Sequence, residues 1–176
     1  MLWQEAYNLH ICDKFAEVEL RVGKQTSSGF NTNVGSTVYN KVLSQLNTLK
    51  WDSVDEYEID DFYYKGNIRK SGNIIIQKEN IYKSNKKCGN VDIRLAINTE
   101  KPVTKTIGGI QTTRKKYRKS FSKQFYRFDV THIKNDDTYE IEMELIGIDY
   151  AKKHSYEFII ENMLKKLTNL ISSANF

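Results

Sequence analysis

The sequence predicts an α+β protein, mainly antiparallel β, built as a closed eight-stranded β-barrel with a few flanking helices, one of them C-terminal. Two observations predict this fold. Most of the chain alternates polar and apolar residues with a period of two, which is typical of strands with two different faces. Short turn-prone pieces, such as residues 86–90 and 135–137, separate these runs.

The size and composition fit a single domain over residues 1–176. A chain of 176 residues encloses one core or cavity, and its one proline, Pro102, marks no interdomain linker. Hydrophobic residues make up only 39% and charged residues 28%, which hints at a polar interior. The net charge of +5 favours encounter with polyanions but decides little alone.

Seven strands and two helices can be placed by their apolar periodicity. The strands are expected at residues 15–23, 59–69, 72–83, 91–100, 112–121, 124–134 and 138–148. Apolar residues at three- and four-residue steps predict a helix over 34–49, with Ser36 or Thr37 as its cap. A stronger amphipathic stripe predicts the C-terminal helix over 156–171.

The polar faces of several predicted strands are charged. Within 138–148, Glu140, Glu142 and Glu144 share one face. On a single strand, such a face is explained by contact with water. Three carboxylates in a row, spaced by roughly 7 Å, nevertheless repel one another unless a metal or a facing row of cations neutralises them.

A basic row lies on the strand predicted at 112–121. Arg114, Lys116 and Arg118 fall on one face of it. Acidic and basic strands would therefore meet across the lumen of a barrel, which at eight strands encloses about one small ligand. The helices would then cover part of the apolar exterior.

The cysteine positions and the hydropathy of the chain limit which metal it could bind and where in the cell it would be found. Cys12 and Cys88 have no zinc-binding spacing and are expected to be two buried free thiols, so hard oxygen ligands for Mg²⁺ or Mn²⁺ remain. No stretch approaches the ~18 apolar residues of a membrane helix. A soluble, intracellular protein is expected, in the cytoplasm or nucleus, with no membrane partner.

Three motifs carry a family resemblance. Residues Glu17-Val-Glu19-Leu-Arg21-Val-Gly23, Arg114-Lys-Lys116-Tyr-Arg118-Lys-Ser120-Phe121 and Glu140-Ile-Glu142-Met-Glu144 resemble, in order and spacing, the motifs of metal-dependent RNA triphosphatases. These enzymes belong to the mRNA capping systems of fungi and large DNA viruses and have the triphosphate-tunnel metalloenzyme fold. Residues 92–100 and 128–131 resemble two further strands of that family.

The resemblance implies a metal site and a phosphate site. Glu17, Glu19 and Glu144 would bind Mg²⁺ or Mn²⁺ directly, with Glu142 and Asp129 holding its waters; Glu140 is the least certain of the acidic set. The residues that would contact phosphate are Arg114, Lys116, Arg118, Arg69 and Lys78, with Lys83 as an alternative to Lys78.

Two further residues have alternative roles. Arg94 would be either a phosphate ligand or a counter-charge of the lumen. Glu100, expected on the wall opposite the metal, would orient the attacking water as a general base. The alternative for Glu100 is a salt bridge in a loop. Phe125, Tyr126 and Phe128 would pack in the core or stack on RNA bases.

The resulting hypothesis is an RNA 5′-triphosphatase that leaves a 5′-diphosphate end for capping. Its partners would be 5′-triphosphate RNA, nucleoside triphosphates, and a guanylyltransferase domain or subunit. The chain would be a whole protein or the N-terminal domain of a longer capping enzyme, and abundant Lys, Asn and Ile hint at a viral genome.

Two alternatives remain open. One is a tunnel enzyme for tripolyphosphate or thiamine triphosphate, although such relatives carry a lysine where Arg21 stands. The other is a non-catalytic, basic RNA-binding barrel.

Overall fold

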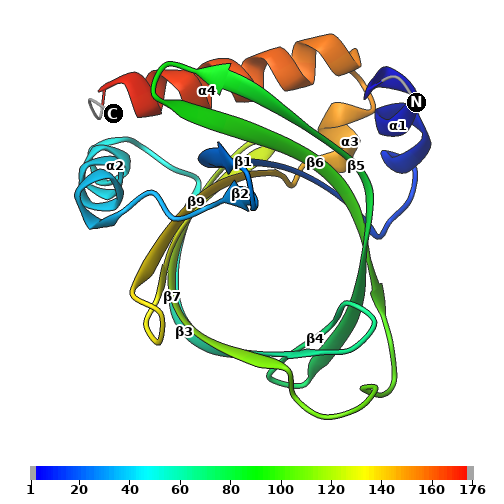
Figure 1. Cartoon of the computed structure of the whole chain (residues 1–176). Coiled ribbons are helices and arrows are strands. Elements are labelled where there is room, and N and C mark those ends of the chain that lie inside the picture. The colour runs from blue at the N-terminus through cyan, green and yellow to red at the C-terminus, as the bar shows by residue number, and fades with distance from the viewer. Residues whose placement is uncertain (1–2, 174–176) are drawn as a thin grey trace.

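The computed structural model describes residues 3–173 and consists of one antiparallel sheet, closed into a barrel, with helices on its outside (Figure 1). Its strands are β1 (Ala16–Thr26), β2 (Gly29–Asn31), β3 (Ser53–Tyr64), β4 (Ile68–Ser71), β5 (Ile74–Cys88), β6 (Val91–Pro102), β7 (Thr112–Lys123), β8 (Tyr126–Ile133) and β9 (Thr138–Leu145). The helices are α1 (Trp3–His10), α2 (Ser36–Thr48), α3 (Ile148–Ala151) and α4 (Tyr156–Ser173).

Closure of the barrel comes from β1, which pairs with β6 on one side and with β9 on the other. The remaining order around the wall is β6, β5, β4, β3, β7, β8 and β9. The ninth strand, β2, pairs with β1 alone and takes no part in the wall. The predicted closed eight-stranded barrel with a C-terminal helix is therefore confirmed.

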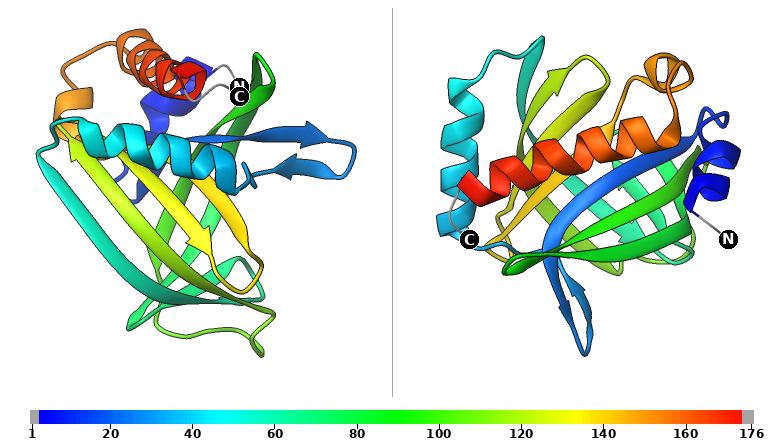
Figure 2. Two further views of the ribbon diagram at one scale, coloured as in Figure 1. Left: turned by 90° about the vertical axis from the view of Figure 1, so that its left-hand side faces the viewer. Right: turned by 90° about the horizontal axis from the view of Figure 1, so that it is seen from above.

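The helices gather on one side of the barrel, as Figures 1 and 2 show. Apolar side chains on the outer faces of the strands, such as Leu20 and Met143, form one buried cluster with Met163 and Leu167 of α4. Each fully buried side chain of this size contributes roughly 1.5–3 kcal/mol of hydrophobic free energy. The apolar faces point outward to the helices, so the charged faces line the lumen.

The aromatic residues Phe125, Tyr126 and Phe128 belong to the same outer core and are at most 6% exposed. Trp51 packs edge-on against both Tyr126 and Phe128. Core packing is thus confirmed for this trio, which leaves no ring face for stacking on RNA.

The strand expected over 59–69 is wrong in its bounds. Strand β3 begins at Ser53, and a turn then separates it from the short β4. Gly66 and Asn67 form this turn with φ angles of +74° and +57°, in the left-handed region that Gly and Asn tolerate best. The sequence did not predict a strand over residues 53–58, because these residues are exposed on both faces and lack apolar alternation.

Strand β5 is longer than expected, and a β-bulge interrupts its pairing with β6 between Asn80 and Tyr82. The extra residue, Ile81, shifts the alternation by one position. As a result Lys78 and Lys83, which strict alternation places on opposite faces, both border lumenal cavities.

A hairpin formed by β1 and β2 was not expected and projects beyond the barrel wall (Figure 2). Gly23 permits this hairpin. A Cβ atom at residue 23 would lie 2.2 Å from the carbonyl oxygen of Asn31 and 2.7 Å from the ring of Phe30. The close return of the chain over β1 therefore requires glycine here.

The helix ends and the cysteines also differ from expectation. Helix α2 begins at Ser36, but its N-cap is Gly35, with no side-chain hydrogen bond, so the predicted Ser or Thr cap is wrong. Helices α1 and α3 were not anticipated. Cys12 is exposed and Cys88 is half-buried; both are free, but the expected burial is wrong. Within residues 3–173, no helix is long and apolar enough to cross a membrane.

Candidate active site

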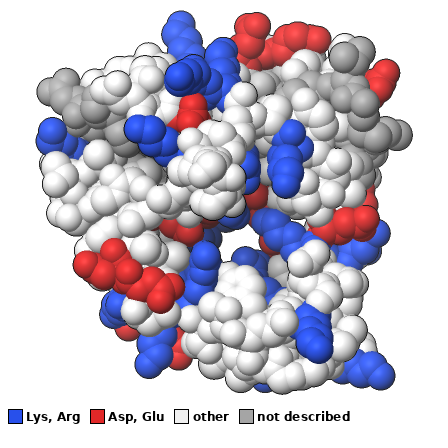
Figure 3. Space-filling model, viewed as in Figure 1, with Lys and Arg blue, Asp and Glu red and all other residues white. Residues whose placement is uncertain are grey.

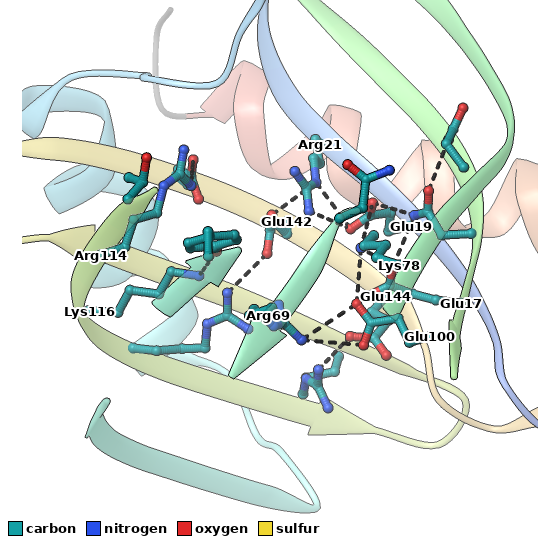
Figure 4. A pocket seen from close by; sticks show the side chains of 18 of the residues that line it. Glu17, Glu19, Arg21, Arg69, Lys78, Glu100, Arg114, Lys116, Glu142 and Glu144 are labelled. Atoms are coloured by element: carbon teal, nitrogen blue, oxygen red, sulfur yellow. Dashed lines mark hydrogen bonds and ion pairs between the residues drawn. The ribbon is translucent and has the colours of Figure 1, made fainter. Parts of the chain in front are cut away.

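A cavity of about 660 Å³ fills the lumen, and charged side chains from seven strands line it (Figures 3 and 4). The register positions them. Because Glu19 of β1 lies opposite Glu144 of β9, and Arg21 opposite Glu142, the two acidic motifs at the ends of the sequence become neighbours. A slip of one residue would turn all of these side chains outward.

The acidic wall is formed by Glu17, Glu19, Glu142 and Glu144 of β1 and β9. Glu19 is 5% exposed and Glu142 is 8% exposed. The side-chain amide of Asn98 donates to Glu17 Oε2 at 2.9 Å and to Glu19 Oε1 at 2.8 Å. The four residues that the sequence predicts around a metal thus lie together on adjacent strands.

Burial and crowding strongly affect the acidity of this wall. Burial raises the pKa of Glu19 above its usual value, and the charges of Glu17 and Glu142 add to the shift against the influence of Arg21. Burial, with Glu17 and Asp129, also raises the pKa of Glu144 to about 8, although Arg127 opposes this. Burial would likewise raise the pKa of Glu142, but Arg21 and Arg118 lower it to about 2.

The basic row of β7 lies in the same cavity. Arg118 binds Asp129 at 3.1 Å and Glu142 at 3.2 Å, and its Nε donates to Thr131 Oγ1 at 2.9 Å. The two carboxylates raise the pKa of Arg118 although burial opposes the shift, so the guanidinium stays charged.

The other two cations of the row have their own carboxylate partners. Lys116 is 6% exposed and pairs with Asp61 at 2.7 Å. Arg114 pairs with Glu140 at 3.4 Å.

A second group of cations comes from β4 and β5. Lys78 binds Glu17, and lies 3.5 Å from Glu19 and 3.2 Å from Glu100. Arg69 pairs with Glu100 at 3.3 Å, while its buried Nε has no hydrogen-bond partner among the described residues. Both cations line the cavity, where the sequence placed Arg69 and Lys78.

Glu100 does not lie where the sequence placed it. It was expected across from the metal carboxylates, but its strand, β6, pairs directly with β1. Glu100 therefore stands beside the acidic wall and shares Lys78 with Glu17 and Glu19 (Figure 4). Its salt bridges with Arg69 and Lys78 come from a strand, not from a loop.

Asp129 also differs from expectation. It is 1% exposed and is not among the residues that line the cavity. Its carboxylate accepts from Ser120 at 2.7 Å and binds Arg118 and Arg127. Asp129 therefore lies on the inner face of β8, beneath Arg118 and Arg127, and orients these two arginines.

Arg94 lies outside the main cavity. It borders a second cavity of about 360 Å³, which shares Lys78, Arg114 and Glu140 with the first. Glu140 sits at this junction, where Thr32 Oγ1 donates to it at 2.7 Å.

Among the charged and amide groups of the lumen, the sequence assigned no role to Arg21, Asn98 or Arg127, nor to Asp61, which contacts the cavity only through Lys116. Arg21, Asn98 and Arg127 lie on the same strand faces as predicted site residues, so the alternation of polar and apolar residues could have placed them in the lumen. For Asp61 the sequence offered no such indication, because this residue lies in an acidic run that breaks the alternation. Asp61 is nevertheless only 3% exposed and forms an ion pair with Lys116.

The donor set suits a hard divalent cation, but the site is not preassembled. Within residues 3–173, no three His, Cys, Asp or Glu side chains converge closely enough to form a metal site as they stand. The carboxylates are instead turned toward Arg, Lys and Asn partners. Their oxygen chemistry, and the raised pKa values of the crowded Glu19 and Glu144, fit a site whose charge a cation would balance.

A closed barrel whose lumen brings carboxylates and cations together defines the triphosphate tunnel class of protein. Residues 20–173 match the family model described as mRNA capping enzyme, beta chain. Because this match covers most of the chain, the protein belongs to that family, the RNA triphosphatases of mRNA capping.

Solved structures show the same fold. The chain resembles the S. pombe Pct1 RNA triphosphatase in complex with the Spt5 CTD, with a TM-score of 0.74 and 16% identity over 94% of this chain and 91% of that one. It also resembles the mimivirus capping enzyme triphosphatase, with a TM-score of 0.64 and 14% identity over 96% and 95%. Sequence comparison with curated proteins gave no significant match.

Proposed function

We propose that this chain is a metal-dependent RNA 5′-triphosphatase, which hydrolyses the β–γ anhydride bond of triphosphate-ended RNA during mRNA capping. The observation that carries the proposal is the meeting of the Arg114, Lys116 and Arg118 row with the acidic wall inside one cavity. The family membership supports RNA as the substrate.

The cations of the lumen would hold the triphosphate. Guanidinium groups bind phosphate oxygens in pairs, and lysine adds a mobile point charge. Arg118 and Lys116 on β7, with Arg69 on β4 and Lys78 on β5, would exchange their present carboxylate partners for phosphate oxygens. The buried Nε of Arg69, which has no partner among the described residues, would gain one if the side chain turned toward the phosphate.

The acidic wall would hold Mg²⁺ or Mn²⁺ through Glu17, Glu19 and Glu144, with Glu142 accepting hydrogen bonds from its waters. When bound, the cation supplies charge neutralisation to the phosphates and to the transition state. Lys78 and Arg127, which now neutralise Glu17 and Glu144, would be released toward the substrate.

Hydrolysis needs one water in line with the bond that breaks. Its oxygen attacks the γ-phosphorus, the bond to the β–γ bridging oxygen breaks, and a 5′-diphosphate end and inorganic phosphate leave. Glu100 would accept the proton of this water and pass it to solvent. Asp129 takes no direct part in this scheme and keeps Arg118 and Arg127 in place.

The same lumen fits related substrates and roles. Free nucleoside triphosphates carry the same triphosphate group and would also be cleaved. A guanylyltransferase, in a longer form of the chain or in a separate subunit, would use the diphosphate end. Such a protein would act inside the cell. Tripolyphosphate or thiamine triphosphate hydrolysis is the second candidate function, because each lumenal contact proposed above is made to phosphate.

The test is phosphate release from triphosphate-ended RNA, ATP and tripolyphosphate in parallel, with Mg²⁺ or Mn²⁺. Glu19→Gln and Glu144→Gln should each lower turnover at least ~100-fold, as expected when transition-state stabilisation is lost. Glu161→Gln on the exposed face of α4 is the control and should match the wild type. Preference for tripolyphosphate would favour the second candidate, and no release from any substrate would overturn the enzyme assignment.

A further inference from the structure

The second cavity opens from the lumen on the side of the β1–β2 hairpin. We call it the vestibule: Phe30, Thr32, Lys83 and Arg94 border it, in addition to residues that it shares with the lumen. The hairpin projects toward the viewer of Figure 1, as the turned views of Figure 2 show. Figure 3 therefore looks at this mouth, with Lys and Arg side chains around the opening.

Arg94 is held flat at this mouth. Its guanidinium carbon lies 4.2 Å from the centroid of the Phe30 ring, and its Nε donates to Asn85 Oδ1 at 2.9 Å. Phe30 is itself pressed against the backbone of Gly23, where there is no space for a Cβ. An aromatic ring, a backbone and an amide thus fix the plane of Arg94 beside the cavity.

The vestibule carries positive charge that the protein does not neutralise. The cations deeper in the lumen, such as Lys78 and Arg118, are ion-paired with carboxylates. In contrast, Arg94 and Lys83 have no carboxylate within ion-pair distance among residues 3–173. The vestibule carboxylates Glu19 and Glu140 are occupied by Arg21 and by Arg114 with Thr32.

We propose that the vestibule binds the first nucleotides of the RNA: the guanidinium of Arg94 stacks on a base, and Lys83 binds the first phosphodiester. Arginine planes stack on unpaired bases, and single-stranded RNA is commonly held by stacking together with backbone contacts. The site would distinguish RNA from inorganic polyphosphate, which ends within the lumen. This inference rests on the proposed function, because it places the RNA body where the triphosphate leaves the cavity.

Junction residues join the two sites. Arg114 and Lys78 border both cavities, so a triphosphate in the lumen and a nucleoside in the vestibule would be continuous. Glu140 also borders both cavities, where it accepts a hydrogen bond from Thr32 and is neutralised by its ion pair with Arg114. This gives Glu140 a place in nucleotide positioning.

Steady-state kinetics on triphosphate-ended RNA and on tripolyphosphate test the proposal. Arg94→Lys keeps the charge but removes the plane, and Lys83→Gln removes the charge. Each should raise KM for RNA about tenfold more than KM for tripolyphosphate, as loss of a stacking or phosphate contact predicts. Lys86→Ala, an exposed residue farther along the same strand, should match the wild type on both substrates.

Equal effects on the two substrates, or no effect on RNA, would overturn the vestibule proposal and leave the enzyme assignment intact. If the wild type releases no phosphate, binding of fluorescent triphosphate-ended RNA, followed by anisotropy, still tests the vestibule. Weaker binding by both variants but not by Lys86→Ala would support it, and unchanged binding would overturn it. Thermal melting checks that each variant is folded.

Discussion

Single side chains in the lumen illustrate why a protein retains buried charge. Glu19, Glu142 and Lys116 are each less than 10% exposed, and removing charged groups from water costs more than an ion pair usually returns. A well-packed apolar lumen would be at least as stable. The charged lumen is therefore best explained by its proposed ligands, a triphosphate and a divalent cation, which would exchange partners with these groups.

Arg118 provides the first prediction at this scale. Arg118→Ala should lower kcat for phosphate release about 100-fold, because the guanidinium is proposed to stabilise charge on the transferred phosphate. Lys115→Ala, which changes an exposed cation on the opposite face of β7, should leave kcat unchanged. Unaltered kinetics in Arg118→Ala would exclude a phosphate-holding role for this residue.

Glu144 provides a pH-dependent prediction for metal-free protein. Its pKa is about 8 in the folded chain against 4.5 ordinarily, so the fold disfavours the charged form. The resulting loss of stability is absent below about pH 4.5, grows up to about pH 8 and stays constant above it. Glu144→Gln removes this loss, so its stability relative to the wild type should increase from about pH 4.5 to about pH 8 and stay level above that.

Urea unfolding in the presence of a chelator measures this difference. Glu161→Gln should show no such trend, because residue 161 is exposed on α4. A relative stability of Glu144→Gln that stays flat or falls with pH would show that the folded protein does not raise the pKa of Glu144.

The sequence predicted which residues face the lumen better than it predicted their neighbours. Alternation placed Glu17, Glu19 and Arg118 correctly on inward faces, because side-chain direction in a strand depends on local geometry alone. Neighbour relations depend on strand order, which alternation does not encode. The resemblance placed Glu100 across the lumen, but it lies beside the acidic wall. Asp129, expected to hold waters of the metal, lies beneath Arg118 and Arg127.

At the scale of elements, alternation found the strands with one apolar face and missed those without it. The first half of β3 is exposed on both faces, and β2 has only three residues. The bulge at Ile81 depends on pairing with β6, so no local signal in β5 marks it. The C-terminal helix was found because its apolar stripe is long; α1 and α3 are short.

Gly23 tests the hairpin at this scale. Gly23→Ala should displace β2 or destabilise the protein by about 1–3 kcal/mol, the usual cost of overpacking. Gly109→Ala is a matched control, since a Cβ there meets nothing within 4 Å. Thermal unfolding compares the two. A Gly23→Ala melting temperature equal to that of Gly109→Ala would show that the return of β2 over β1 is less tight than described.

At the scale of the whole molecule, the two faces of the barrel sheet have different roles. The outer face of the barrel packs against the helices on one side and provides the hydrophobic core, while the inner face contributes little apolar packing and carries the proposed chemistry (Figure 1). Closure between β1 and β9 is the decisive step, because it joins residues more than 120 positions apart into one acidic wall. The charged inner faces made a lumen predictable, but the strand order that builds the wall was not.

Triphosphatase activity is tested by release of γ-labelled phosphate from triphosphate-ended RNA, with and without added Mg²⁺ or Mn²⁺. We expect metal-dependent release of the γ-phosphate as inorganic phosphate, retention of the α-label on RNA that ends in a 5′-diphosphate, and no release in the presence of a chelator. Absence of phosphate release with either metal, or release of pyrophosphate in its place, would contradict the proposed function.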